Sequence, residues 1–467
     1  MLPVISLLVQ VGGGLSLARY GAHVKQLVDS IVTEPYMDEI FHVPQAVLMC
    51  RRAWTPDPQV TTPPGLYWLT LVYQRIAYLG GWDTDCTRLT MLRNVSLAGL
   101  MALPLLIDMY LGITMPSLSR YAPMYRSLVG LAVATIPPLY FFGFLYYTDV
   151  ASTALVLIAM TLAEAQQHLF ASVTGLLAMT VRQNNVVWVA FILGQALLAE
   201  LRRRTPSLAW SNAPPLRPLL QQRAVRHALI EIALPYLPTL CLFAAFVVWN
   251  GGAIALGDKA HHQLAFHVSQ LGYFFAFALF FGWPALACAL WQRPVRVDRR
   301  ALTLWAALSA VGCVGVYVGT YVHPFLLADN RHYTFYVWRR IIDATPWSRY
   351  ALVPAYVASG LLWISSLRTL TGTDAGHTRC AYWLAGFLAA LALTVVPTPL
   401  LEPRYFVLPY IVLRLEVARA TIVRPRAVAA VVLELVWYTA INVATIYVFL
   451  YRPFTWEGTP GWQRFLW

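Results

Sequence analysis

The sequence predicts an all-α protein that crosses a membrane many times. Of its 467 residues, 59% are hydrophobic and only 12% are charged, whereas soluble globular chains average about 45–50% apolar and about 25% charged residues. The mean hydropathy of +0.58 agrees with this class. The length would allow two or three soluble domains, but most of the apolar residues would then lack a polar surface to cover them. The composition therefore excludes a soluble multidomain protein.

Apolar stretches recur along the whole chain, which is interpreted as a single transmembrane domain of residues 1–467. The hydrocarbon core of a bilayer is about 30 Å thick and requires roughly 20 apolar residues per helix. About thirteen stretches approach this requirement, of which the fifth and the twelfth are short. The predicted spans lie near 4–22, 90–112, 127–146, 150–166, 168–181, 186–201, 229–250, 270–291, 301–322, 350–366, 381–397, 404–420 and 428–450.

The charged residues predict the orientation of these spans. Arginine concentrates in alternate connectors, which the positive-inside rule assigns to the cytosol. These connectors fall within 120–126, 202–226, 293–300, 368–379 and 414–426. The N-terminus is then cytosolic and, with an odd number of spans, the C-terminus is lumenal. Because the net charge of +13 is spread over short connectors, it does not indicate a nucleic-acid partner.

The remaining connectors face the lumen in this topology and carry the chemically versatile residues. The first, 23–89, is long and contains an acidic segment rich in aromatic residues. The others contain acids, amides, histidines and arginines. Arginines on the lumenal side oppose the topology rule, so we expect them to serve a purpose other than membrane insertion.

The acidic pair Asp38-Glu39 is the first candidate for catalysis. A carboxylate in a partly apolar pocket can be tuned to act as a general base on a hydroxyl group. His42 lies four residues after Asp38 and would share its helix face. The alternative is a solvated helix N-terminus, because Pro35 suits a first helical position and acids there favour the helix dipole.

Arginines near two lumenal segments are candidates for binding a phosphate. Asp329, Arg331 and His332 lie in one segment, and Arg404 stands between Glu402 and Tyr405 in another. Arginine offers a bidentate fork to phosphate oxygens. The alternative is that these segments are interfacial anchors with an aromatic belt.

The cysteines and the acidic triplet in the first connector are less informative. Cys50 and Cys86 share this connector and could pair in an oxidising compartment, but two cysteines alone do not establish a pairing. The sequence contains no C-x-x-C pair, so the cysteines do not indicate a zinc site. The triplet Asp83-Thr84-Asp85 is interpreted as incidental, because metal-dependent sugar-nucleotide chemistry requires a soluble nucleotide-binding domain that the chain does not contain.

Seven motifs in collinear order resemble one family over nearly the whole chain. They are EPYMDEIFHVPQA (34–46), TTPPGLY (61–67), FLYYTD (144–149), NGGAIALGDK (250–259), LLADNRHYTFYVWRR (326–340), EPRYFVLPY (402–410) and QRFLW (463–467). They are similar to the endoplasmic-reticulum dolichyl-phosphate-glucose-dependent α-1,2-glucosyltransferases, which add the third and last glucose to the lipid-linked oligosaccharide for N-glycosylation. One departure is VRQNN at 181–185, where the family more usually has FRQTN.

The resemblance implies a GT-C membrane fold with its active site on the lumenal face of the endoplasmic reticulum. It implies inverting transfer of glucose from dolichyl phosphate glucose to a dolichyl-diphosphate oligosaccharide, without a metal or another cofactor. It aligns Asp38 with the general base, accompanied by Glu39, and it assigns Arg331, His332 and Arg404 to the donor phosphate. The implied substrate-binding residues are His42, Asp149, Arg182, Gln183, Lys259, Asp329 and Glu402.

Two other functions are alternatives to this glucosyltransferase: another GT-C transferase and a transporter. Another dolichyl-phosphate-sugar-dependent transferase of the GT-C class would need nearly the same site, and only the long motifs argue against it. A transporter for lipid-linked sugars would show charges near mid-bilayer and internal repeats. Here the polar motifs gather on one predicted face and no repeat is evident.

Overall fold

The computed structural model is helical and describes residues 2–115, 119–205, 216–259, 263–292, 294–295, 297–370, 374–456 and 459–467. Arg293 and Arg296, two of the arginines behind the predicted topology, lie outside these residues. The helices of the bundle are α1 (Leu2–Ile31), α4 (Leu89–Thr114), α5 (Ala122–Ala134), α7 (Thr148–Glu164), α8 (His168–Val181), α9 (Asn185–Arg204), α11 (Arg223–Ala233), α12 (Leu237–Trp249), α13 (Ser269–Gln292), α14 (Arg299–Val318), α18 (Val353–Leu370), α19 (Asp374–Val395), α20 (Arg404–Ala420) and α21 (Pro425–Tyr451).

The remaining elements lie mostly in the connectors between these helices. They are α2 (Glu39–Cys50), α3 (Gly65–Leu79), α6 (Pro137–Phe142), α10 (Leu216–Gln221), η2 (Leu234–Tyr236), α15 (Pro324–Ala328), α16 (Tyr333–Val337), η3 (Trp338–Ile342), α17 (Ser348–Ala351), β1 (Phe454–Trp456) and β2 (Thr459–Gln463). The antiparallel pair β1–β2 was not predicted. Within the described residues it is the only sheet, so the all-α class is confirmed.

Seven helical segments in the described part of the chain are long and apolar enough to cross a membrane. The structure therefore confirms a multi-pass membrane protein but not the predicted number of thirteen spans. The prediction of one span over 127–146 was wrong, because α5 ends at Ala134 and α6 begins at Pro137. Two consecutive prolines cannot continue a helical hydrogen-bond ladder, so the chain starts a new helix there.

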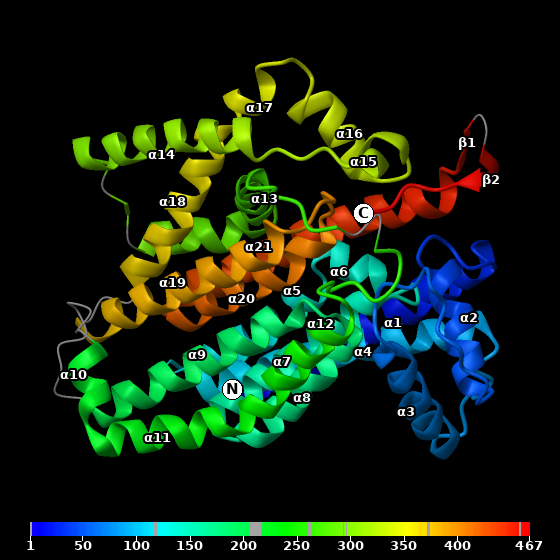
Figure 1. Ribbon diagram of the computed structural model, residues 1–467, viewed down its shortest axis with the longest axis horizontal. Coiled ribbons are helices and arrows are strands. Elements are labelled where there is room, and N and C mark those ends of the chain that lie inside the picture. Colours follow the sequence, from blue (N-terminus) through cyan, green and yellow to red (C-terminus); the bar gives the residue numbers. More distant parts are fainter. Residues whose placement is uncertain are drawn as a thin grey trace.

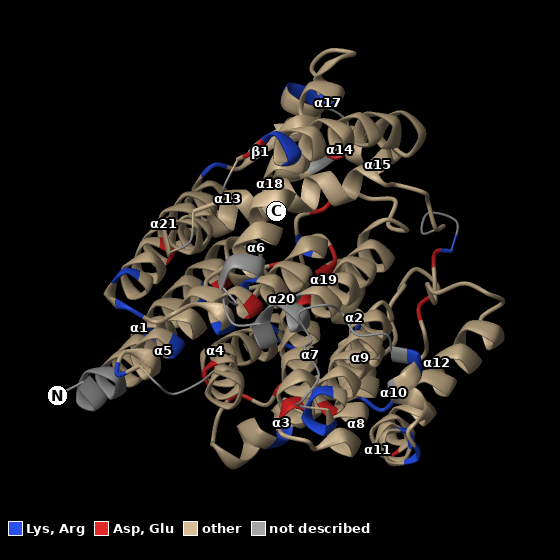
Figure 2. Ribbon diagram, turned by 90° about the vertical axis from the view of Figure 1, so that its left-hand side faces the viewer, with Lys and Arg blue, Asp and Glu red and all other residues tan. Residues whose placement is uncertain are grey.

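The helix α20 is the centre of the bundle. It occupies the residues of the short twelfth predicted span, and every described side chain from Tyr410 to Ala418 is buried. A helix that is buried all round belongs to a core rather than to a lipid-facing surface. By contrast, α14 exposes most of its apolar side chains, as a lipid-facing helix would. Figure 2 shows how sparse the charged residues are along the helices.

The connectors gather at two opposite ends of the bundle (Figure 1). One end, on the left of Figure 1, contains α10 and several arginine-rich connectors. There the Ser119 hydroxyl donates to the carbonyl of Val423 at 2.8 Å, and Gln292 donates to the carbonyl of Ile422 at 3.2 Å. The other end, on the right, contains α2, α3 and the β1–β2 hairpin. This separation agrees with the alternating connectors of the sequence.

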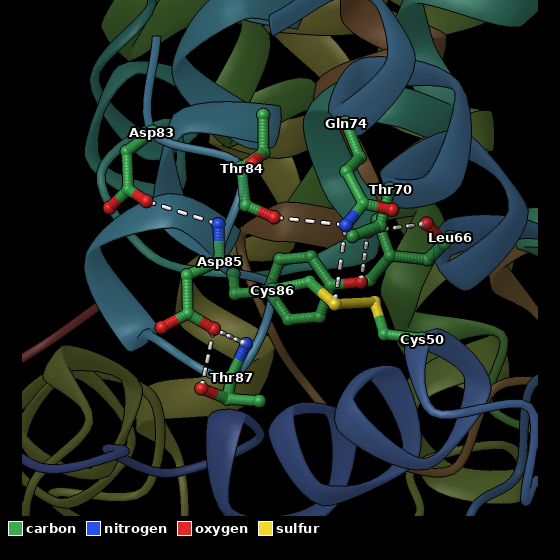
Figure 3. Close-up of a disulfide and its surroundings, with 10 residues drawn as sticks. Cys50, Leu66, Thr70, Gln74, Asp83, Thr84, Asp85, Cys86 and Thr87 are labelled. Atoms are coloured by element: carbon green, nitrogen blue, oxygen red, sulfur yellow. Dashed lines mark hydrogen bonds between the residues drawn. A yellow bond between two sulfur atoms is a disulfide. The ribbon is translucent and has the colours of Figure 1, made fainter. Parts of the chain in front are cut away.

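The first connector is itself folded. The helix α1 continues to Ile31, past its predicted end at residue 22, so the connector is shorter than the predicted 23–89 and contains α2 and α3. A disulfide joins Cys50 at the end of α2 to Cys86, with the two Cα atoms 6.3 Å apart (Figure 3). In the same turn Asp85 accepts hydrogen bonds from the amide and hydroxyl of Thr87. The acidic triplet therefore shapes this turn.

Candidate active site

Asp38 stands directly before α2, with its carboxylate turned away from that helix. It occupies the N-cap position but makes no capping hydrogen bond with its side chain. Its Oδ2 atom instead accepts from Nη1 of Arg404 at 2.5 Å, and its backbone N–H donates to the Tyr147 hydroxyl at 3.0 Å. The geometry therefore argues against a simple helix-capping role, which was the alternative explanation of this acid.

Arg404 joins two carboxylates that are far apart in sequence. It begins α20 and pairs with Glu402 as well as with Asp38. Its guanidinium also faces the rings of Phe142 and Tyr147, each at 5.8 Å. Burial alone would raise the pKa of Asp38, but the adjacent Arg404 cation holds it below its usual value. Asp38 is therefore ionised at neutral pH, as a general base must be.

Glu39 points in another direction and is completely buried. Nε and Nη2 of Arg93 donate to its two carboxylate oxygens at 2.9 and 2.7 Å. The backbone N–H groups of Tyr146 and Tyr36 donate to the same carboxylate at 2.7 and 3.1 Å. With both oxygens occupied, Glu39 anchors the start of α2 and has no lone pair directed at a substrate.

Sequence reasoning missed Arg93, which has no exposed surface. Besides Glu39, its guanidinium donates to the carbonyl of Val32 at 2.8 Å and contacts Asp29 at 3.3 Å. One buried cation thus connects the end of α1, the start of α2 and α4. The available signal was a charge inside an apolar stretch, since such residues nearly always pair within the protein.

His42 lies beside Asp38 on α2. It is buried, and its Nδ1 atom lies 3.0 Å from the Tyr67 hydroxyl. Burial lowers its pKa to about 4. At neutral pH the ring is therefore uncharged and can exchange hydrogen bonds with hydroxyl groups without competing with Arg404 for Asp38.

A pocket opens between α6, α7, α9 and α20. Arg182 and Asp149 form an ion pair at 2.9 Å there, and Nε of Arg182 donates to the Thr148 hydroxyl at 2.8 Å. Both residues line the pocket together with Arg404 and Asn184. The structure therefore places two of the predicted substrate-binding residues next to the Asp38–Arg404 pair.

Gln183 and Lys259 lie outside this pocket lining. The Gln183 amide donates to the carbonyl of Thr61 in the first connector at 2.6 Å. Lys259 is exposed and donates to the carbonyl of Asn250 at the end of α12 at 2.9 Å. In this structure both side chains hold connectors in place, so nothing in their geometry supports the predicted substrate contacts.

Asp329, Arg331 and His332 form a second cluster. The Arg331 guanidinium donates to the two oxygens of Asp329 at 2.8 and 2.7 Å. His332 Nε2 lies 3.8 Å from the same carboxylate. Burial would raise the pKa of Asp329, but its hydrogen bonds with Arg331 keep it below its usual value. Arg331 and His332 do not line the pocket of Arg404 and Asp149, so the predicted phosphate ligands fall into two groups.

Comparison with known proteins identifies related chains over nearly the full length. A mouse protein named Dol-P-Glc:Glc(2)Man(9)GlcNAc(2)-PP-Dol alpha-1,2-glucosyltransferase is 34% identical over 470 residues, with 93% of each chain covered. An Arabidopsis thaliana protein of the same name is 31% identical, with 94% of this chain and 96% of the relative covered. No solved structure matches the chain. The model of the DIE2/ALG10 family matches residues 32–415, and the chain belongs to that family.

Proposed function

We propose that this protein is an inverting α-1,2-glucosyltransferase. It would transfer glucose from dolichyl phosphate β-D-glucose to the diglucosylated dolichyl-diphosphate oligosaccharide, completing the N-glycan precursor. The names of the relatives describe this acceptor and linkage. The structural observation that carries the proposal is the Asp38 carboxylate, which accepts a hydrogen bond from Arg404, a residue that lines the pocket beside Arg182 and Asp149.

The reaction is a single displacement. Asp38 accepts the proton of the acceptor 2-hydroxyl while that oxygen attacks the anomeric carbon of the donor. The new C–O bond forms on the face opposite the bond to phosphate, so the β-linked glucose becomes α-linked. The electron pair of the broken bond leaves on dolichyl phosphate. Because this leaving group is already an anion of low basicity, the site requires cationic residues but no general acid.

The charges around the pocket suggest how the donor binds. Arg182 and Arg404 face three carboxylates, those of Asp38, Glu402 and Asp149. This cluster has no excess positive charge for a phosphate and offers many hydrogen-bonding groups to sugar hydroxyls. We therefore infer that the glucosyl hydroxyls bind at this cluster, while Arg331 and His332 supply additional donors to the phosphate. The dolichyl chain would lie in the bilayer beside the helices.

The experiment that tests the proposal uses the purified full-length protein. It is incubated with dolichyl phosphate glucose and the diglucosylated lipid-linked oligosaccharide, and the product linkage is determined by NMR spectroscopy. We expect one additional α-1,2-linked glucose. Transfer only from dolichyl phosphate mannose, or only to a monoglucosylated acceptor, would show that the protein is a different transferase. Movement of lipid-linked sugar across vesicles without transfer would support transport.

The first prediction concerns membrane orientation. We place the site end in the lumen of the endoplasmic reticulum, because a disulfide in the first connector fits an oxidising compartment and because the arginine-rich connectors lie at the opposite end. In a variant that keeps the Cys50–Cys86 pair and lacks the other cysteines, Asp83→Cys should react with an impermeant maleimide only after sealed microsomes are permeabilised. Arg424→Cys should react in intact microsomes. The reverse pattern would contradict this orientation.

A second prediction concerns the donor phosphate. Arg331→Ala should lower kcat/KM for the donor about 10- to 150-fold, since a hydrogen bond to a charged group contributes about 1.5–3 kcal/mol. Arg331→Lys should recover only part of this loss, because lysine cannot keep the two-point contact with Asp329 and also donate to the phosphate. The exposed Arg340, on the same segment, provides the matched control: Arg340→Ala should retain normal turnover. Normal turnover by a folded Arg331→Ala variant would make Arg331 a structural anchor.

A third prediction concerns pH. With Arg404 present, the pKa of Asp38 is depressed, so kcat/KM should stay constant from neutral pH down to acidities near the usual carboxyl pKa of about 3.9. In Arg404→Gln, burial acts on Asp38 without the opposing cation. The acidic limb of the profile should therefore move to higher pH. Arg404→Lys keeps the charge and should keep the limb close to its original position; equal displacement in both variants would contradict this assignment.

A further inference from the structure

Residues 461–467, here called the strap, lie along the second cluster. The Leu466 N–H donates to the carbonyl of Arg331 at 3.0 Å, and the Tyr333 N–H donates to the carbonyl of Leu466 at 3.1 Å. These bonds form a parallel bridge between His332 and Leu466. The strap therefore holds the backbone of the two predicted phosphate ligands.

The same strap contacts the segment that carries Asp38. The Tyr36 hydroxyl donates to the carbonyl of Arg464 at 2.7 Å and accepts from the Arg464 N–H at 2.8 Å. Tyr36 is two residues before Asp38, and its own N–H is bonded to the buried Glu39. Among the described residues, no hydrogen bond joins 329–333 directly to 36–39, so the strap is the hydrogen-bonded bridge between the two segments.

The strap is itself firmly attached. Nη1 of Arg464 donates to the carbonyls of Phe449 and Leu450 in the last turn of α21, at 2.8 and 2.9 Å. Leu466 is only 1% exposed, and the ring of Phe465 is nearly parallel to that of Tyr333. A cation that caps the carbonyls of a helix end is favourably placed. The strap is thus attached to the end of α21, and its hydrogen bonds do not involve the residues of the pocket.

We propose that the strap positions the donor-phosphate cluster relative to the general base, with the Tyr36 hydroxyl as the pivotal contact. This inference rests on the proposed function. Among the described residues, Arg331 and His332 make no hydrogen bond to Asp38, so their placement relative to Asp38 depends on an intervening element. The strap is bonded to the backbone of residues 331–333 on one side and to the Tyr36 hydroxyl on the other, and it supplies that element. Tyr36, Arg464 and Leu466 are accordingly positioning residues.

The test begins with Tyr36→Phe, which removes one oxygen and the two hydrogen bonds it makes. We expect the KM for dolichyl phosphate glucose to rise about tenfold, the scale of one lost hydrogen bond. The KM for the acceptor and the thermal unfolding midpoint in detergent should stay unchanged. Trp462→Ala is the matched control, because Trp462 belongs to the strap but is 66% exposed, and it should leave both KM values unchanged.

A second pair of variants separates the strap's backbone contact from its packing. Leu466→Pro removes the N–H that bonds to Arg331, whereas Leu466→Ala keeps this N–H and loses most of the side chain. The donor KM should rise more in the proline variant. Equal effects in both variants, or equal increases in donor and acceptor KM, would overturn the positioning role and leave a purely structural one.

Hydrogen exchange provides a measurement that does not depend on activity. In Tyr36→Phe the amides of Tyr333 and Leu466 should exchange faster than in the wild type, while α20 stays protected. Unchanged exchange at these amides would contradict the proposed bridge through Tyr36 and the strap, whether or not the protein transfers glucose. If exchange accelerates as expected but the wild type transfers no glucose, the bridge stands, whereas both the proposed function and the positioning role that rests on it fail.

Discussion

Asp38→Asn should reduce turnover by about 100- to 10,000-fold, the range of a lost general base. The amide keeps the volume of the carboxylate but cannot accept the acceptor's hydroxyl proton. Arg404 retains Glu402 as a partner, so the pocket should keep its shape. Donor KM should therefore change little while kcat falls, which is the pattern of an interaction made mainly in the transition state.

The exposed acid Asp83 provides the control for this variant. It lies in the same connector, and its carboxylate contacts Arg88 at the surface. Asp83→Asn should retain full turnover at matched expression. If Asp38→Asn instead turned over normally with the diglucosylated acceptor, Asp38 would only hold Arg404 in place, and the base would have to be sought among Asp149 and Glu402.

The sequence predicted single elements better than the contacts between them. The α20 boundaries follow from its apolar stretch, and Asp38, Arg404 and Glu402 stand out as charged residues in connectors of the predicted lumenal face. That Asp38 pairs with Arg404, however, depends on a contact across 366 positions. No local spacing encodes such a contact, because it results from how α2 and α20 each pack against α4.

The predicted site residues differ in what they contact in the structure, and these differences have physical causes. Asp38 and Glu39 are adjacent and chemically alike, yet successive helical positions point about 100° apart. One carboxylate therefore faces Arg404 at the pocket while the other is enclosed by Arg93. The family resemblance implied substrate contacts for Lys259 and Gln183, but in the structure each contacts a backbone carbonyl. Sequence alone does not distinguish a polar side chain that binds a ligand from one that donates a hydrogen bond to a backbone carbonyl in a connector.

Glu39→Gln and Arg93→Gln should each destabilise the protein by about 3–5 kcal/mol, the usual cost of removing one partner from a buried ion pair. Arg93→Gln leaves the fully buried Glu39 carboxylate without its cation, and Glu39→Gln leaves the fully buried Arg93 with Asp29 as its remaining carboxylate partner. The loss should appear as a lower thermal unfolding midpoint and lower yield. Turnover per folded molecule should fall far less than in Asp38→Asn, since Glu39 does not face the pocket.

A double variant, Glu39→Leu with Arg93→Met, provides the matched test of this explanation. Replacing both charges by apolar side chains of similar size removes the cost of an unpaired buried charge, and such exchanges are often neutral in stability. The double variant should therefore be more stable than Glu39→Leu or Arg93→Met alone, with a coupling free energy of at least about 1 kcal/mol in the cycle of these variants. Some cost should remain, because the Tyr36 and Tyr146 N–H groups lose their acceptor. Additive losses in stability would contradict the coupling of this ion pair. A Glu39→Gln variant that folds normally but has lost its turnover would instead assign Glu39 a direct part in catalysis.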